Sequence, residues 1–130
     1  MRLLLDTHVW LWLLDQPNRI DEHVFRQIDE ASELLLSAAS IWELAIKDQL
    51  GRLGAKTNVA ELRDEILREM TAIELAITAR HGLVAAQLPM VHKDPFDRML
   101  VAQAQCEEVT LVTADASVLH YGGDILWAGK

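Results

Sequence analysis

The sequence is poor in cysteine and has no long apolar run. A single Cys106 excludes an internal disulfide, which agrees with a reducing compartment. No apolar stretch approaches the roughly 20 residues that a membrane-spanning helix needs. The apolar start at Leu3–Leu5 is interrupted by Asp6, too early for a signal peptide. We therefore expect a cytoplasmic protein without a membrane segment.

Positive charge is also scarce. Lys and Arg number 12 against 20 Asp and Glu, so the formal net charge is −8. A protein that binds nucleic acid through phosphate neutralisation is normally basic, so this balance argues against simple groove binding. The acidic surplus fits carboxylates that converge on divalent cations, or a basic partner. Composition alone does not choose between these two.

The sequence does contain enough apolar residues for a core, at 51% of 130 residues, which is the usual size of one domain. Short apolar runs alternate with helical patterns along it. This alternation predicts an α/β fold, a single domain over residues 1–130, with a parallel sheet flanked by helices on both faces. The expected strands are residues 2–5, 34–36, 72–75, 109–113 and 124–127; the expected helices are residues 8–14, 21–31, 40–50, 57–70, 77–86 and 94–107.

Four acids stand beside these elements. Asp6 follows the first strand and Asp115 follows the most strongly predicted one, while Glu43 and Asp97 lie one turn into two helices. Ligands of open parallel sheets bind outside the carboxyl ends of the strands, so all four acids have a route to one crevice. Gathered carboxylates repel one another, and Mg²⁺ or Mn²⁺ would relieve that repulsion through the oxygen ligands these ions prefer.

Each acid also has a local structural explanation, of differing strength. Ser40-Ile41-Trp42-Glu43 matches the capping box, so Glu43 would then only bind a backbone N–H. Asp94 before Pro95 fits a helix N-cap, and Asp97 in the first turn favours the helix dipole. Asp6 has the weakest explanation of this kind, because no local capping motif accounts for it.

Taken together, the blocks LLLDTHVWLW, SAASIWELAIK, HKDPFDRMLVAQA, LVTAD and YGGDILW resemble the PIN-domain ribonucleases, and more narrowly the toxin half of bacterial VapBC-type toxin–antitoxin pairs. The resemblance runs from Leu3 to Trp127. It implies a PIN-like three-layer fold, a Mg²⁺ or Mn²⁺ site and phosphodiester hydrolysis of RNA. The family's acids fall on Asp6, Glu43, Asp97 and Asp115, as both metal ligands and catalytic residues. Whether one or two metals act stays open.

The resemblance also implies partners: an RNA substrate, a cognate antitoxin and a second copy of the chain. Trp10–Leu14, apolar all round, is expected to pack both inside the domain and against another chain, either the second copy or the antitoxin. Thr7 and Thr113 are candidates for hydroxyls near the metals. Among the scattered bases, Arg98 is expected nearest a phosphate. The other basic candidates are Lys47, Arg52, Lys56 and Lys93.

Other classes compete with this interpretation. A receiver domain should show a pair of acids after the first strand, whereas Asp6 stands alone. A haloacid-type phosphatase would need a second Asp at position 8, which is His8. A non-catalytic PIN-like module that binds protein or RNA ranks second, because all four acids that catalytic members need are present.

Overall fold

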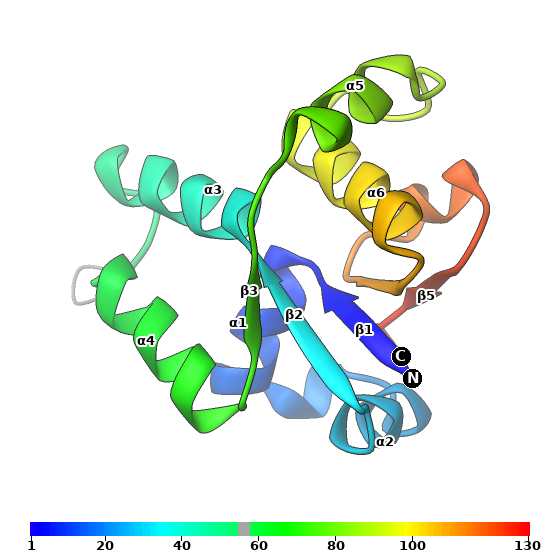
Figure 1. Ribbon diagram of the computed structural model, residues 1–130. Helices are drawn as coiled ribbons and strands as arrows, with labels where there is room; N and C mark the ends of the chain where they lie inside the picture. The colour runs from blue at the N-terminus through cyan, green and yellow to red at the C-terminus, as the bar shows by residue number, and fades with distance from the viewer. Residues whose placement is uncertain (55–57) are drawn as a thin grey trace.

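The centre of the molecule is a parallel sheet of five strands in the order β3-β2-β1-β4-β5 (Figure 1). The computed structural model describes residues 1–54 and 58–130. Every neighbouring pair of strands runs parallel, which confirms the predicted sheet. The strands are β1 (Arg2–Leu5), β2 (Glu33–Ser37), β3 (Ile73–Leu75), β4 (Thr110–Thr113) and β5 (Ile125–Trp127).

Helices connect the strands close to where the sequence predicts them. The predicted helix start at Thr57 and the basic candidate Lys56 lie outside the described residues. None of the helices in the described ranges is long and apolar enough to cross a membrane. The helices are α1 (Thr7–Asp15), α2 (Glu22–Asp29), α3 (Ala38–Gln49), α4 (Val59–Glu69), α5 (Ala79–Gln87) and α6 (Pro95–Glu107), with 3-10 turns η1 (Pro17–Arg19) and η2 (Ala116–Tyr121).

The strands bury alternate residues on opposite faces, as the period of two requires. In β1, Leu3 and Leu5 join one apolar cluster, whereas Leu4 joins another. The first cluster draws on α1, α2 and α4, including Trp10, Ile28 and Ile66. The second draws on α6 and η2, including Leu100, Val101 and Val118. The predicted layers on both faces of the sheet are therefore confirmed.

The strand order changes direction at β1. The chain passes from β1 to β2 on one side, and later returns to place β4 on the other side of β1. Connections that leave β1 and β4 therefore diverge and open a crevice at the carboxyl edge of the sheet. Asp6 follows β1 directly, and Asp115 is the N-cap of η2 after β4.

The N-caps of α1 and α3 differ from the expectation. The N-cap of α3 is Ser37, whose hydroxyl accepts from the Ala39 N–H at 3.0 Å, so Ser40 and Glu43 lie inside the helix. The capping-box interpretation of Glu43 is therefore wrong. The statement that no local cap explains Asp6 is also wrong, because Asp6 is the N-cap of α1.

Candidate active site

The predicted acids meet in one cleft of about 560 Å³ at the carboxyl edge of the sheet. Asp6, Glu43, Asp97 and Asp115 all line it, although they come from four different segments of the chain. Asp94, the N-cap of α6, adds a fifth carboxylate. The remaining lining residues are His8, Trp12, Arg19, His92, Ala114, Ala116 and Trp127.

Asp6 is the most rigidly held acid, with only 4% of its surface exposed. Its Oδ1 accepts from the Val9 N–H at 2.9 Å, which caps α1. Its Oδ2 accepts from Thr113 Oγ1 and from the Ala114 N–H, each at 2.8 Å. Burial raises the pKa of Asp6 above its usual range, and these donated hydrogen bonds work against that rise. One carboxylate thus joins the ends of β1 and β4.

Glu43 is buried on α3 and faces a hydroxyl of α1. Thr7 Oγ1 lies 2.6 Å from Glu43 Oε1 and 2.9 Å from Ser40 Oγ. The hydroxyl of Thr7 has one proton, and an ionised carboxylate can only accept, so Thr7 donates to Glu43. Lys47 Nζ approaches the other oxygen, Oε2, at 3.3 Å. Thr7 therefore orients the Glu43 carboxylate, and its expected place near a bound metal stays a prediction.

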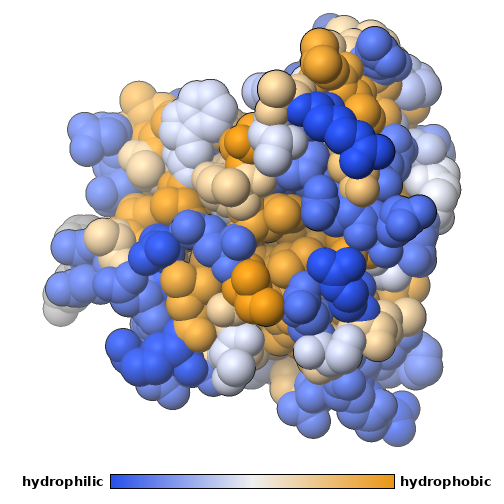
Figure 2. All heavy atoms as spheres, viewed as in Figure 1, coloured by the Kyte–Doolittle hydropathy of each residue, from blue (hydrophilic) through white to orange (hydrophobic). Residues whose placement is uncertain are grey.

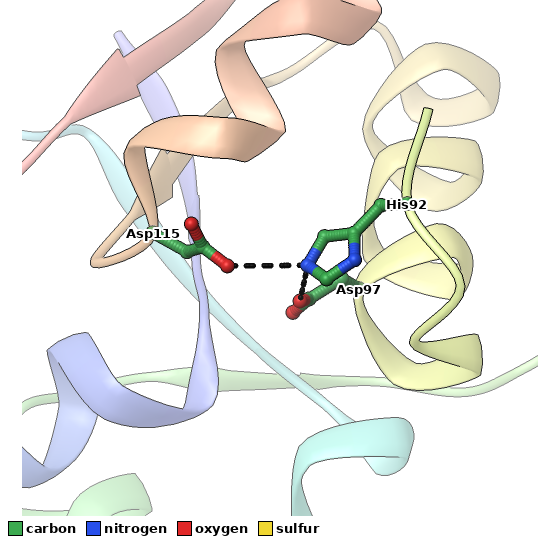
Figure 3. Close-up of side chains that lie close together, drawn as sticks. All are labelled: His92, Asp97 and Asp115. Atoms are coloured by element: carbon green, nitrogen blue, oxygen red, sulfur yellow. Dashed lines mark hydrogen bonds and ion pairs between the residues drawn. The ribbon is translucent and has the colours of Figure 1, made fainter. Parts of the chain in front are cut away.

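Asp97 and Asp115 are joined by an imidazole (Figure 3). His92 Nε2 lies 3.0 Å from Asp97 Oδ2 and 3.1 Å from Asp115 Oδ2. These ligand atoms all lie within 4.8 Å of one another, close enough to surround a single cation. The backbone of His92 is held by Tyr121, whose hydroxyl accepts from the His92 N–H at 3.1 Å.

The two aspartates of this group have opposite pKa shifts. Desolvation, followed by the negative charges of Asp94 and Asp6, raises the pKa of Asp97 to about 7, and His92 opposes the rise. Hydrogen bonds from Ser117 lower the pKa of Asp115 below its usual range. The cleft is therefore short of positive charge around Asp97. A hard divalent cation fits this set of oxygen donors and this deficit.

Arg98 does not lie where the sequence suggested. Its Nη2 donates to the carbonyls of Ala85 at 2.8 Å and Leu88 at 3.0 Å, and its Nη1 to Pro89 at 3.0 Å. The guanidinium thus ties the end of α5 to the segment that leads to His92. The expectation that Arg98 contacts a phosphate is wrong; it is a structural residue.

Sequence reasoning missed several residues that line the cleft, including His92, Arg19 and Trp127. His92 precedes Asp94 by two residues, so proximity to the motif was the available signal, but a lone histidine is more often structural. Arg19 has no such signal, because it follows Pro17 in a turn far from any acidic block. Its guanidinium carbon lies 4.5 Å from the ring centroid of Trp12, another residue that lines the cleft.

The chain matches the family model described as "PIN domain" over residues 3–123. It is 30% identical over 114 residues to Ribonuclease VapC22 of Mycobacterium tuberculosis, which covers 87% of this chain and 86% of the relative. Its fold is similar to that of VapBC2 from Rickettsia felis, solved bound to a DNA fragment from their promoter, with a TM-score of 0.73, 15% identity and 100% of both chains covered. It is also similar to a toxin–antitoxin complex from Klebsiella pneumoniae, with a TM-score of 0.65, 13% identity and 96% of both chains covered.

Proposed function

Because the chain belongs to the PIN domain family, we propose that it is a metal-dependent endoribonuclease whose active site is the acidic cleft. The observation that carries the proposal is the convergence of Asp6, Glu43, Asp97 and Asp115 on one cleft. A module that only bound protein or RNA would have no need to gather mutually repelling carboxylates, two of them buried, at the carboxyl edge of its sheet.

In this proposal the four carboxylates hold Mg²⁺ or Mn²⁺. A divalent cation bound there would supply the charge stabilisation and water activation that phosphodiester hydrolysis requires. The chain's own residues fix the donors. Thr113 and the Ala114 N–H orient Asp6 at 2.8 Å, and Thr7 orients Glu43 at 2.6 Å. In the absence of a cation, His92 Nε2 lies between the Asp97 and Asp115 carboxylates.

We also propose that the protein is the toxin of a toxin–antitoxin pair, neutralised by a cognate antitoxin. The name of the VapC22 relative and the toxin–antitoxin complex from Klebsiella pneumoniae support this assignment. Charge complementarity supports it too, because a basic antitoxin segment could enter a cleft lined by five carboxylates. The cytoplasmic location expected from the sequence stays a prediction.

Self-association of two copies is a further part of the proposal. The α3 helix exposes an apolar stripe at a spacing of four residues, made by Trp42, Ile46 and Leu50. Trp42 is 60% exposed and packs edge-on against Phe96, with ring centroids 5.2 Å apart. Figure 2 shows hydrophobic side chains at the centre of the face that carries β3, with hydrophilic ones around them.

The expected role of α1 at such an interface is not supported by its packing. Trp10 is buried in the core, and Trp12, Leu13 and Leu14 pack partly buried against the same cluster. The apolar character of α1 is therefore used within the chain. The exposed stripe of α3 is the better candidate for contact with a second copy.

The test of the enzymatic proposal is cleavage of single-stranded RNA with Mn²⁺, with Mg²⁺ and with EDTA. Asp6→Asn and Asp97→Asn should each reduce the rate at least about 100-fold, because each removes an anionic donor to the cation. Asp64→Asn, an exposed acid of α4 that pairs with Arg63, is the matched control and should cleave normally. Full Mn²⁺-dependent cleavage by Asp97→Asn would overturn the proposed site.

A further inference from the structure

We propose that Trp12, Arg19 and Trp127 form an RNA-binding wall of the cleft, which takes the nucleotide next to the scissile phosphate. In this wall Arg19 binds a phosphate and the Trp127 indole stacks on a base. The inference rests on the proposed ribonuclease function. It adds an explanation of how an acidic cleft binds RNA, which is itself a polyanion.

Arg19 is the one permanently cationic side chain among the residues that line the cleft. Its guanidinium lies over Trp12 at 4.5 Å, and its Nη1 donates to Gln16 Oε1 at 3.3 Å. Within residues 1–54 and 58–130 it forms no ion pair with a carboxylate. Stacking on the indole therefore positions the guanidinium while its charge stays free. A planar guanidinium in that state suits bidentate binding of a phosphate.

Trp127 is 41% exposed and yet closely packed against the backbone. A Cβ added at Gly129 would lie only 2.7 Å from the indole, so residue 129 must lack a side chain for the ring to keep this position. The next residue, Ala128, is fully buried, and its N–H donates to the Thr113 carbonyl at 2.8 Å. An indole that is exposed but already immobilised loses little entropy when a base stacks on it.

The same C-terminal segment joins Trp127 to Arg19. Gly129 forms an antiparallel bridge with Ile20, and the Asp21 N–H donates to the Ala128 carbonyl at 2.8 Å. The residue after Arg19 is thus paired with the second residue after Trp127. The segments that carry the cation and the exposed ring are therefore held together by backbone contacts.

This arrangement favours single-stranded RNA as the occupant. Five carboxylates line the same cleft and repel a phosphate backbone unless cations are bound. A free guanidinium beside a fixed aromatic ring offers the pair of contacts that single-stranded binders use, a charge for the backbone and a platform for a base. In a duplex the base faces are covered by their neighbours, so stacking on Trp127 requires an unpaired strand.

The test compares variants of the full chain with a fluorescein-labelled single-stranded RNA in Mn²⁺. Arg19→Ala and Trp127→Ala should each raise KM about ten-fold, while kcat changes less than about three-fold, because the wall binds RNA without touching the reacting atoms. Trp127→Phe should recover most of the loss. Arg26→Ala and Phe25→Ala, which change exposed residues of α2 outside the cleft, are the matched controls.

A second measurement separates stacking from a merely structural role. In the Asp97→Asn background, which holds RNA without cutting it, an RNA with one abasic nucleotide beside the scissile position should bind about ten-fold more weakly than the intact RNA. That difference should vanish when Trp127→Ala is added. Gly129→Ala, which displaces the ring, should behave like Trp127→Ala, with circular dichroism confirming that it folds.

The outcomes distinguish the two proposals. If the native chain cleaves RNA and the variants of Arg19 and Trp127 cleave and bind it equally well, the proposal of an RNA-binding wall is wrong. A protein partner would then be the remaining candidate for this surface, and the proposed ribonuclease function would stand. If the native chain shows no Mn²⁺-dependent cleavage, the proposed function fails and the wall fails with it.

Discussion

At the scale of single residues, Asp97 carries the strongest charge conflict of the cleft. Desolvation is the main cause, and the negative charges of its neighbours Asp94 and Asp6 add to it, so its pKa rises to about 7. The unfolded chain gives an aspartate its usual pKa near 4. Between these values the folded, metal-free protein binds more protons than the unfolded chain, so its stability falls as the pH rises from about 4 to about 7.

Asp97→Asn should therefore stabilise the metal-free protein while it abolishes cleavage. We expect the melting temperature to rise by a few degrees at pH 8, since relief of this screened repulsion is on the order of 1 kcal/mol. The gain should shrink towards pH 5, where Asp97 is already protonated. Thermal melts of both proteins in EDTA measure it, and a gain that grew towards pH 5 would contradict the assignment.

Arg98 has a different role, which is structural. Arg98→Ala leaves the carbonyls of Ala85, Leu88 and Pro89 without their charged donor. We expect a loss of about 1–3 kcal/mol in the free energy of unfolding, measured with urea, because removing a charged partner leaves polar groups unsatisfied. Arg68→Ala, which removes an exposed pair with Glu69, should cost less than about 0.5 kcal/mol.

Residue types and order were sufficient to predict the acids but not their hydrogen-bond partners. Asp6 could be identified because it follows a buried strand, yet its bonds to Thr113 and Ala114 join positions more than 100 residues apart. Such contacts depend on which strands become neighbours, and no local pattern encodes that. Arg19 was missed for the same reason, since its place in the cleft depends on the bridge between Ile20 and Gly129.

At the scale of elements, the start of α3 shows how a local motif can mislead. The capping box at Ser40 and Glu43 is a valid pattern, but the N-cap of the helix is Ser37, three residues earlier. Ser37 Oγ also donates to Gln103 Oε1 of α6 at 2.5 Å, so the first turn of α3 is held by a tertiary contact that the pattern does not include. Tertiary contacts of this kind override local propensity.

The two serines should therefore respond differently to substitution. Ser37→Ala removes a helix cap and a buried hydrogen bond, and should cost about 1–2 kcal/mol. Ser40→Ala should cost less than about 1 kcal/mol, because Thr7 keeps its bond to Glu43. Urea unfolding in EDTA compares them, and an equal or larger loss for Ser40→Ala would show that the cap lies at Ser40.

At the scale of the whole molecule, the exposed α3 stripe leads to a prediction about assembly. The native chain should have twice its 14.6 kDa mass by multi-angle light scattering. The double variant Trp42→Glu with Leu50→Glu should have the mass of one chain, since two charges would interrupt an apolar interface. The double variant Leu83→Glu with Met90→Glu changes exposed apolar residues elsewhere and should stay dimeric. A native chain that is monomeric at high concentration would remove this part of the proposal.

The contact of Asp6 with Thr113 and Ala114 has a consequence for biosynthesis. Asp6 is made early, but its Oδ2 is held by Thr113 and Ala114, and β1 lies against β4. Folding during translation proceeds as segments emerge, so a nascent chain has no assembled cleft until Ala114 has left the ribosome. The proposed activity therefore depends on β4 having emerged and paired with β1, however early Asp6 itself is synthesised.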